Sequence, residues 1–598
     1  MLGKLRIFNE VVEKVLKVLS KEQKKKSVSA FIAIVIASFL ELLGVTIIVP
    51  FITAVMNPGI FLNNQYILSF MNFLGVVEVD SSAILIAFGV LLILIYIAKN
   101  IGLLFSRYIQ NAYQANLQKD ISTMMMKSYL NHPYEFFVNT NSAEIMRGVE
   151  TDVSGFTEII RVLFTCLAEL ITVILIIGFV LTTDFLTSIG LVGVASLCVI
   201  IIVFGCKNVM AKTGNRNRKA TALKSKCAYQ TVNGIKEIFV MQRKKFFLKE
   251  YEAACEEFGA IRKLYLLVTS IPERIIETMV VCGIVAIVCI RILQGYAAEA
   301  YIPQLAALAI ACFRLLPSLG KLTDGVSQMV YNKPCLDAVY NNIEEAREYV
   351  RKNTILSDAI SYEDMTHLTF ENEIEINDIT WRYINGDRNI LEHTSLKIYK
   401  GESVALIGES GAGKSTLADI IMGLLHPQCG SVLVDGKSIE ANYFQWANMI
   451  GYVPQTVYLI DDTIRNNVAF GIPQDEIRDD AVWAALRQAR LEEYVSSLTH
   501  GLDTIVGERG IKFSGGQRQR IAIARTMYYD PEILVLDEAT SALDDETEKA
   551  VMESIDSLQG KKTLIIIAHR LSTIQKCDKI YEVTDGKIIE RNKADVLK

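Results

Sequence analysis

The first half of the chain alternates long apolar segments with polar connections. Lys and Arg are absent from 57–82, 183–185 and 294–301 but abundant in 107–156 and 207–272. Because cytoplasmic connections are enriched in Lys and Arg, we expect a multi-pass protein of the plasma (inner) membrane with both termini in the cytoplasm. The segments long enough to cross a bilayer, which takes about 20 apolar residues, are 28–56, 83–106, 157–182, 186–206, 273–293 and 302–320.

These spans divide the chain into four parts. Residues 1–26 have apolar residues at helical spacing and a basic end, without the features of a signal peptide, and predict a cytoplasmic helix. Residues 27–330 would form the helical membrane domain. Residues 331–370 are polar and acidic and predict a linker. We expect residues 371–598 to form a soluble α/β domain.

Composition agrees with this division and excludes some classes of function. Apolar residues make up 51% of the 598 residues and the mean hydropathy is +0.30, which is high for a soluble chain of this size. The net charge of −5 mixes both signs, so nothing indicates nucleic acid as a partner. The eleven cysteines, from Cys166 to Cys577, have no paired spacing and fit neither a disulfide framework nor a zinc site.

A phosphate-binding loop stands in the soluble domain. The apolar run 404–407 predicts a buried strand, 417–425 predicts a helix, and G-E-S-G-A-G-K-S lies between them. Glycines let backbone N–H groups turn toward phosphate oxygens, the helix N-terminus adds a positive dipole end, and Lys414 supplies a mobile charge. We therefore expect a nucleotide to contact Gly408, Glu409, Ser410, Gly411, Ala412, Gly413, Lys414, Ser415 and Thr416.

Two further motifs of this domain suit the same chemistry. Asp537 ends the apolar run 533–536, so its carboxylate would stand at the carboxyl end of a strand, where it can hold Mg²⁺ beside phosphates. Glu538 follows it and can polarise an attacking water. Ser514, Gly515, Gly516 and Gln517 open a predicted helix and form a second candidate anion site at its N-terminus.

Together these motifs resemble the nucleotide-binding domain of ATP-binding cassette (ABC) transporters. The phosphate loop, Gln455, the 514–517 segment, Asp537-Glu538, Ser541 to Asp544 and His569 stand in the family's order and spacing. With the six preceding spans, the chain resembles an exporter-type half-transporter. The implied fold is an α-helical membrane domain of six long transmembrane helices, followed by an α/β P-loop NTPase domain, the ABC cassette.

The resemblance implies a role for each motif and a dimer. In the family two cassettes close head to tail, so the 514–517 segment would complete the ATP site of a second half-transporter, which we expect to be an identical chain. The implied contacts are Tyr383 on the adenine of ATP, Ser415, Gln455 and Asp537 on Mg²⁺, His569 on the γ-phosphate, and Glu538 as general base. Closure of the cassettes would reach the spans through short helices near 139–146 and 234–240.

Three other stretches resemble the subgroup that flips lipid-linked oligosaccharides, namely 234–251, 271–278 and 313–318. The last places Arg314 about midway along the sixth span, where a charge usually faces a water-filled interior. Lys99, Glu41 and Glu169 in the second, first and third spans are further candidates, although such charges can also pair or snorkel. Residues 57–77 would either grip a lipid tail or pack on the outer helix ends. We expect a polyisoprenyl-diphosphate-linked oligosaccharide as cargo.

Two other interpretations stay open. An exporter of hydrophobic drugs, free lipids or peptides would share this architecture. A sensory or channel-regulating membrane protein, in which ATP gates an interface without pumping, is a different class of function. Intact Glu538 and His569 argue against it, because such a protein would not need to hydrolyse ATP.

Overall fold

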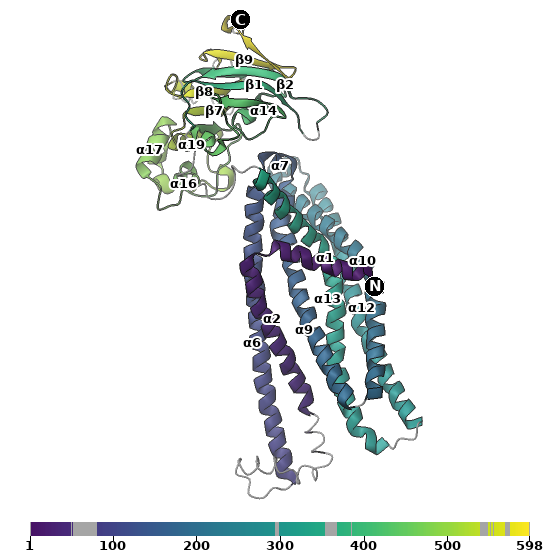
Figure 1. Ribbon diagram of the computed structural model, residues 1–598. Helices are drawn as coiled ribbons and strands as arrows, with labels where there is room; N and C mark the ends of the chain where they lie inside the picture. The colour runs from purple at the N-terminus through teal and green to yellow at the C-terminus, as the bar shows by residue number, and fades with distance from the viewer. Residues whose placement is uncertain are drawn as a thin grey trace. The chain divides into compact units, whose positions relative to one another are not determined.

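The chain folds into two units in the computed structural model (Figure 1). The membrane unit comprises residues 1–132 and 139–349, and the cassette unit comprises 133–138 and 350–598. The structure describes the chain apart from residue 1, most of 49–80, residue 184 and residues 294–297, 353–367, 384–385, 539–547, parts of 550–556, 569–573 and 597–598.

The described part of the membrane unit is helical throughout. Its elements are α1 (Leu2–Val18), α2 (Lys21–Thr46), α6 (Ser81–Leu130), α8 (Ser142–Arg147), the π-helical turn η1 (Gly148–Asp152), α9 (Val153–Thr183), α10 (Phe185–Asn233), α11 (Ile235–Val240), α12 (Lys244–Leu293) and α13 (Ala298–Lys352). Helix α7 (Tyr134–Asn139) lies between α6 and α8 in the chain, and most of it groups with the cassette unit.

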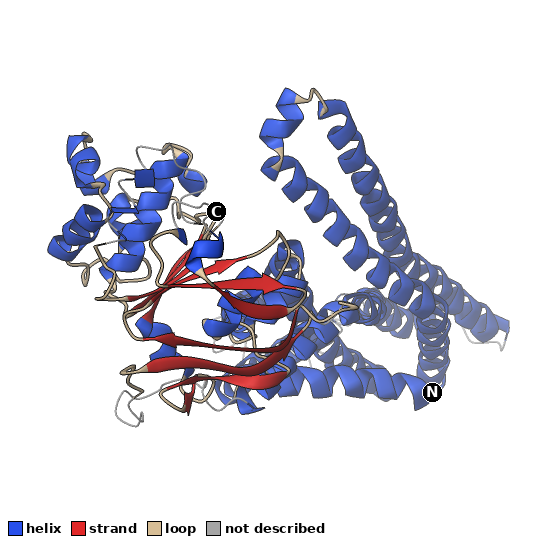
Figure 2. Cartoon of the chain, turned by 90° about the horizontal axis from the view of Figure 1, so that it is seen from above, coloured by secondary structure: helices blue, strands red, loops and turns tan. Residues whose placement is uncertain are grey.

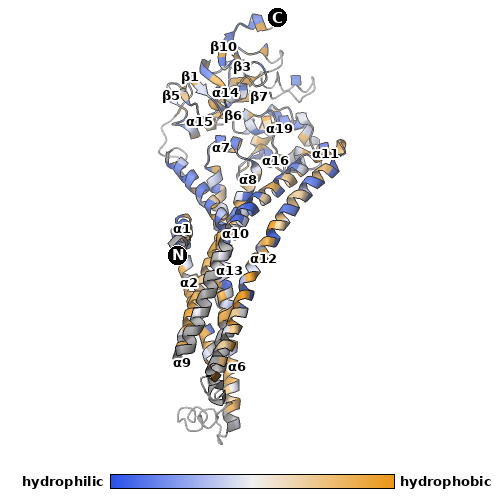
Figure 3. Ribbon diagram, turned by 90° about the vertical axis from the view of Figure 1, so that its right-hand side faces the viewer, coloured by the Kyte–Doolittle hydropathy of each residue, from blue (hydrophilic) through white to orange (hydrophobic). Residues whose placement is uncertain are grey.

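Six of these helices correspond to the six predicted spans, which confirms the predicted fold class. Four of them, α6, α10, α12 and α13, have 49 to 55 residues, or about 75 Å of helix, and therefore extend well beyond a bilayer core of about 30 Å. Figure 3 shows apolar positions along α6 and α12. Within the described residues, three segments meet length and hydropathy limits for a membrane span: Lys21–Gly44, Leu85–Leu130 and Ser142–Gly178.

Two element boundaries differ from the sequence expectation. Residues 1–26 are not one helix, because α1 ends at Val18 and Ser20 caps a new helix in a capping box with Gln23. The predicted linker from 331 is helical up to Lys352. Its buried positions, Leu336, Val339, Ile343 and Ala346, recur at helical spacing.

The extension of α13 is joined to α1 by ion pairs. Lys14 Nζ donates to Asp337 Oδ1 at 2.6 Å, and Lys333 Nζ donates to Glu10 Oε2 at 3.1 Å. These ion pairs join segments more than 300 residues apart, so the sequence around 331 does not identify the partner of this helix.

The cassette contains two sheets (Figure 2). One is antiparallel with strand order β2-β1-β4-β5, and the other has order β10-β9-β3-β8-β7-β6, in which all neighbours but β10 and β9 run parallel. The strands are β1 (Glu373–Trp381), β2 (Leu391–Tyr399), β3 (Ser403–Ile407), β4 (Cys429–Val434), β5 (Lys437–Ser438), β6 (Ile450–Val453), β7 (Ile533–Asp537), β8 (Thr563–Ile567), β9 (Lys579–Thr584) and β10 (Lys587–Arg591).

The larger sheet has a hydrophobic core on each face, because successive strand residues point to opposite sides. Leu406 and Val535 pack in one core with helix α14, and Leu534 and Leu536 pack in the other with helix α19. The cassette helices are α14 (Lys414–Ile421), α15 (Tyr443–Met449), α16 (Ile464–Val468), α17 (Asp479–Gln488), α18 (Glu492–Ser497), α19 (Gly515–Tyr528) and α22 (Lys593–Val596), with 3₁₀ turns at Gly501–Asp503 and Glu508–Gly510.

Candidate functional site

The phosphate-binding loop has a backbone that only glycine permits at two positions. Gly408 has φ of +142°, and a Cβ there would overlap the carbonyl oxygen of Val583. Gly413 has φ of +107°, and a Cβ would lie 2.9 Å from Ile390 Cγ2. The loop leaves β3 and enters α14 at Lys414, so its N–H groups and the helix N-terminus face one place, as phosphate binding requires.

Lys414 lies across this loop. Its Nζ donates to the carbonyl oxygens of Gly408 and Glu409, at 2.9 Å each. Burial lowers the pKa of Lys414, whereas the nearby carboxylates of Glu538 and Asp537 act in the opposite direction. The lysine and the acidic pair therefore share one electrostatic environment.

The acidic pair stands beside Gln455. The parallel strands β6 and β7 pair Val453 with Leu536, and this register carries Gln455 to Glu538, where Gln455 Nε2 donates to Glu538 Oε2 at 2.6 Å. Asp537 is the last residue of β7, and Glu538 has a left-handed backbone with φ of +46°. The strand order thus brings together three residues predicted for hydrolysis and Mg²⁺.

Tyr383 follows β1 and packs edge-on against Trp381, with ring centroids 4.4 Å apart. Tyr383 is 37% exposed, so part of it can contact a planar group such as a base. The same β1–β2 connection reaches the phosphate loop where Ile390 meets Gly413. This arrangement suits the predicted role on adenine.

The 514–517 segment caps helix α19. Ser514 Oγ accepts from the Gln517 N–H, and Gln517 Oε1 accepts from the Ser514 N–H, which forms a capping box. Helix α19 packs on the sheet face opposite to α14. The segment and the phosphate loop of one chain therefore begin helices on opposite faces of the sheet.

Some predicted residues lie outside the described part of the chain. These are His569 and the 541–544 segment, and the side chain of Arg314 in α13. Residues 57–77 also lie there.

A cluster around Asp419 was not predicted from the sequence. Asp419, on α14, is partly buried, and burial, followed by the charge of Asp537, raises its pKa to about 6. Tyr134 of α7 lies near Asp419, and residues 133–138 group with the cassette unit. The short helix near 139–146, predicted to pass cassette closure to the spans, groups with the membrane unit. The Pro-aromatic sequence from His132 to Phe137 was the only signal of this contact.

The membrane unit contains a polar cavity of about 500 Å³ between α2, α6, α9 and α13. The predicted residue Glu41 lines it. Lys99 instead lies over the Tyr96 ring, 4.5 Å from its centroid, where α6 meets α2. The charged and amide residues around the cavity include Arg107, Gln110, Asn111, Gln114, Arg161, Glu169, Lys321, Asp324 and Gln328.

Several cavity residues tie α9 to α13. Glu169 accepts from Ser318 Oγ at 2.6 Å and from Lys321 Nζ at 2.5 Å. Arg161 Nη2 donates to Gln328 at 3.3 Å. Sequence reasoning missed Lys321 because it lies just past the apolar run 302–320. Its helical spacing from position 314, two turns earlier, was the available signal.

Comparison with known proteins identifies the class. Residues 391–541 match the family described as ABC transporter, and residues 43–294 match the ABC transporter transmembrane region. The chain belongs to the ABC transporter family. It is a half-transporter, a multi-pass membrane protein with an ATP-binding cassette that hydrolyses ATP to drive export.

Relatives and a solved structure agree with this assignment. An ATP-dependent lipid A-core flippase of Vibrio cholerae is 29% identical, with 82% of this chain and 83% of the relative covered. A protein with the same description from Vibrio parahaemolyticus is 43% identical over 38% of this chain and 39% of its own length. A bacterial Atm1-family ABC exporter with ATP bound has the same fold, with a TM-score of 0.72, 21% identity and 96% of both chains covered.

Proposed function

We propose that two copies of this chain form an exporter that flips an anionic glycolipid outward, and that a polyisoprenyl-diphosphate-linked oligosaccharide is the cargo. The observation that carries the cargo class is the polar cavity of about 500 Å³ among apolar helices. A glycolipid needs polar partners for its head group and an apolar surface for its tail, and buried charges in membrane helices usually serve such a path.

The charges around the cavity suit a phosphorylated head group. Arg107 lines the cavity and has no carboxylate partner among the residues that the structure describes. Position 314 lies two turns before Lys321 on α13, so an arginine there would extend the same helix face. Arginine binds phosphate oxygens through two parallel hydrogen bonds, which supports Arg314 as a contact for the pyrophosphate.

The curated relatives favour a lipid over the other exporter cargoes. The names of the two relatives given above include a lipid cargo. The drug or peptide exporter remains the second candidate within transport, and it predicts indifference to Arg314→Ala. An ATP-gated regulatory protein remains the least favoured alternative.

The homodimer is supported by the geometry of one cassette. Since α14 and α19 cover opposite sheet faces, a second cassette facing the first can bring its 514–517 segment to the phosphate loop. Ser514, Gly515, Gly516 and Gln517 of each copy would then contact the ATP held by the other.

The residues present fit Mg²⁺ held between protein and phosphates. Magnesium is usually bound by one or two protein oxygens plus substrate phosphates, and no cluster of three or more His, Cys, Asp or Glu occurs among the described residues. Ser415, Gln455 and Asp537 would hold it, and bound Mg²⁺ would neutralise charge on the phosphates.

The proposed chemistry is in-line attack of water on the γ-phosphate. Glu538, held by Gln455, orients the water and accepts its proton, while Lys414 and the loop N–H groups stabilise the phosphate charge. His569 and Tyr383 complete the contacts to the γ-phosphate and adenine. Both termini would lie in the cytoplasm of a cell bounded by the plasma (inner) membrane, as the distribution of Lys and Arg indicates.

The test is a flipping assay in proteoliposomes that have the cassettes outside. We expect ATP-dependent loss of a polyisoprenyl-diphosphate oligosaccharide from the outer leaflet with wild type, and none with Glu538→Gln or Arg314→Ala. Arg216→Ala is the matched control, because its ion pair with Glu257 is exposed. If wild type hydrolyses ATP but moves no glycolipid, the cargo proposal is wrong, and lipid A-core, free lipids, drugs and peptides are tested next.

A further inference from the structure

A buried carboxylate lies where four helices of the membrane unit converge. Asp152, at the end of the π turn, is 1% exposed. Arg218 of α10 donates to both of its oxygens, from Nε at 3.2 Å and from Nη2 at 3.1 Å. Cys335 of α13 contacts the same carboxylate, and Tyr129 of α6 interacts electrostatically with it. None of the motifs described above includes this group.

The helices approach one another so closely there that three glycine positions have no room for a side chain. A Cβ added at Gly148 would overlap the Tyr129 hydroxyl, and one at Gly155 would lie 2.7 Å from Cys335 Sγ. A Cβ at Gly214, one turn before Arg218, would overlap the Tyr331 carbonyl oxygen of α13. Since these contacts are already tight, a shift of α9 at this point must be passed on to α10 and α13.

The π turn decides which charges face Asp152. Helices α8 and α9 continue into one another through Gly148–Asp152. Residues five apart point about 140° away from each other on an α-helix, whereas a π turn, which closes i→i+5 hydrogen bonds, brings them to the same side. The turn thereby places Arg147 beside Asp152, with Nε 3.5 Å from Oδ2.

The second arginine is incompletely satisfied. The Nε of Arg147 is buried and has no hydrogen-bond partner within the described residues, although Arg218 has two bonds to the shared carboxylate. A buried donor without an acceptor costs free energy, so a change of register that gave Arg147 an acceptor would recover that cost. Single π turns in long helices occur often at functional sites.

We propose that Asp152 is a positioning residue for coupling, at a joint whose π turn changes register when α8 moves and so carries the movement to α10 and α13. Asp152 touches neither ATP nor cargo. It acts by holding α9 to α10 through Arg218, while Arg147 joins or leaves the carboxylate. The inference rests on the ATP-driven cycle of the family and not on the identity of the cargo.

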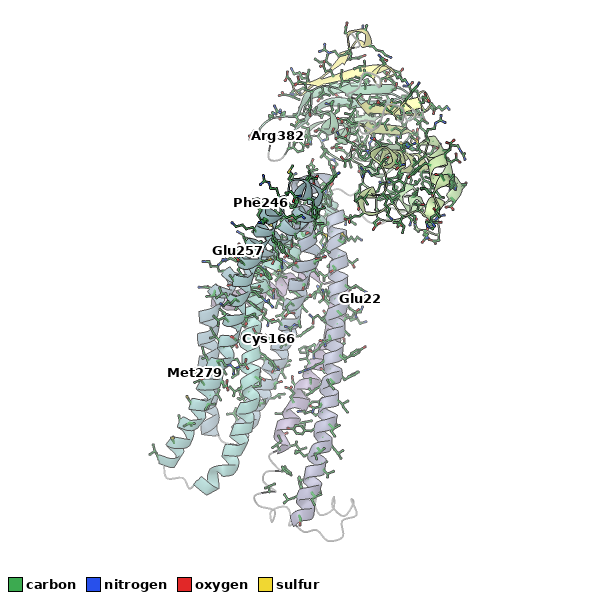
Figure 4. The ribbon with its side chains drawn as sticks, turned by 180° about the vertical axis from the view of Figure 1, so that it is seen from behind. Glu22, Cys166, Phe246, Glu257, Met279 and Arg382 are labelled. Atoms are coloured by element: carbon green, nitrogen blue, oxygen red, sulfur yellow. The ribbon has the colours of Figure 1, made fainter. Side chains whose placement is uncertain are left out.

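The test compares amide hydrogen exchange in the full-length protein with and without Mg-ATP and vanadate. In wild type we expect nucleotide to change exchange in the phosphate loop and in peptides around Arg218 and Cys335. With Asp152→Asn, the phosphate-loop change should persist and the change around Arg218 and Cys335 should shrink about fivefold or more. Arg216→Met, which removes an exposed charge two residues from Arg218 and paired with Glu257 on α12 (Figure 4), should behave as wild type.

A second variant separates the joint from simple packing. A π turn is equivalent to one extra residue in an α-helix, so deletion of the exposed Glu150 should restore a regular helix and keep Arg147 and Asp152 on one side. We expect this variant to melt close to wild type and to bind ATP, yet to lose the change around Arg218.

Two results would overturn the proposal. One is a wild-type exchange response around Arg218 in the Glu150 deletion. The other is that Asp152→Asn and Arg218→Lys lower the melting temperature but leave the nucleotide response unchanged, since Asp152 would then be a packing residue only. If Asp152→Asn also loses the exchange response in the phosphate loop, that variant has failed to bind ATP. Arg147→Lys, which leaves Asp152 and Arg218 in place, then serves as the test variant. An exchange response around Arg218 equal to that of wild type in Arg147→Lys would overturn the proposal.

Discussion

The cassette and the membrane unit position their polar groups by different means. In the cassette, Lys414 bonds to carbonyls five and six residues away. Gln455 and Glu538 are 83 residues apart, but each follows a strand, and the register of the paired strands β6 and β7 brings them together. In the membrane unit, the partners of buried carboxylates come from distant helices: Arg218 for Asp152, 66 residues away, and Ser318 for Glu169, 149 residues away. A motif can therefore specify the first kind of site, whereas only helix packing specifies the second.

The largest effect should come from the cassette. Glu538→Gln keeps the hydrogen-bonding shape but cannot accept a proton, so we expect ATP turnover to fall about 10³-fold, or about 4 kcal/mol of barrier. ATP binding, measured by equilibrium dialysis, should remain. Turnover within a factor of two of wild type would exclude Glu538 as general base.

Gly408→Ala tests whether a single glycine is required for the conformation of the phosphate loop. Alanine there combines a strained φ with overlap of the Val583 carbonyl, and we expect a loss of about 3 kcal/mol of stability together with loss of ATP binding. Gly471→Ala is the control, because Gly471 also has positive φ but open space around it, and it should cost about 1 kcal/mol. Thermal melting of both variants compares them, and equal costs would contradict the steric argument.

The cluster around Asp419, which was not predicted from the sequence, should make the stability of the protein depend on pH. Because burial raises the pKa of Asp419 to about 6, this carboxyl favours folding when protonated, and that contribution is lost as pH rises from about 4 through 6. Asp419→Asn should therefore stabilise the protein at pH 7.5 by about 2 kcal/mol, allowing for solvent screening, and less at pH 4.5. Melting curves across this range measure the difference, and a gain independent of pH would rule out titration of Asp419 as its cause.

Substitution of Glu169 tests how much the contacts between helices α9 and α13 contribute to the stability of the membrane unit. Glu169→Gln retains an acceptor for Ser318 but leaves Lys321 without its ion pair, so we expect a loss of about 1.5 kcal/mol. The double variant Glu169→Gln with Lys321→Met should regain part of this stability in detergent melting curves. Additive losses in the double variant would show that the two residues do not interact.

The smallest effect should come from the helix cap at 514. Ser514→Ala removes an acceptor for the Gln517 N–H and should cost about 1 kcal/mol of stability. If Ser514 also contacts ATP in a dimer, turnover should fall by far more than this stability loss explains. Ser514→Thr, which keeps the hydroxyl, is the control, and activity that follows stability alone would leave Ser514 as a cap only.

The fold class could be predicted from local sequence patterns, and so could the residues proposed for the cassette site. Long apolar runs specify helices in a membrane, and Gly408 to Ser415 specify a phosphate loop, because glycine conformations and helix ends are properties of a few adjacent residues. The candidates for hydrolysis followed from the same local logic, since Asp537 and Glu538 end a recognisable strand.

Tertiary structure decided the rest. Residues 331–352 have apolar positions at helical spacing, but no pattern near 331 shows that this helix pairs with α1 through Lys14 and Asp337. Asp152 and Asp419 are ordinary acids in the sequence, and Glu169 is one of several charges in the apolar spans. Each becomes distinctive only when packing removes it from water and supplies a particular partner, because desolvation and charge pairing depend on which helices meet in space.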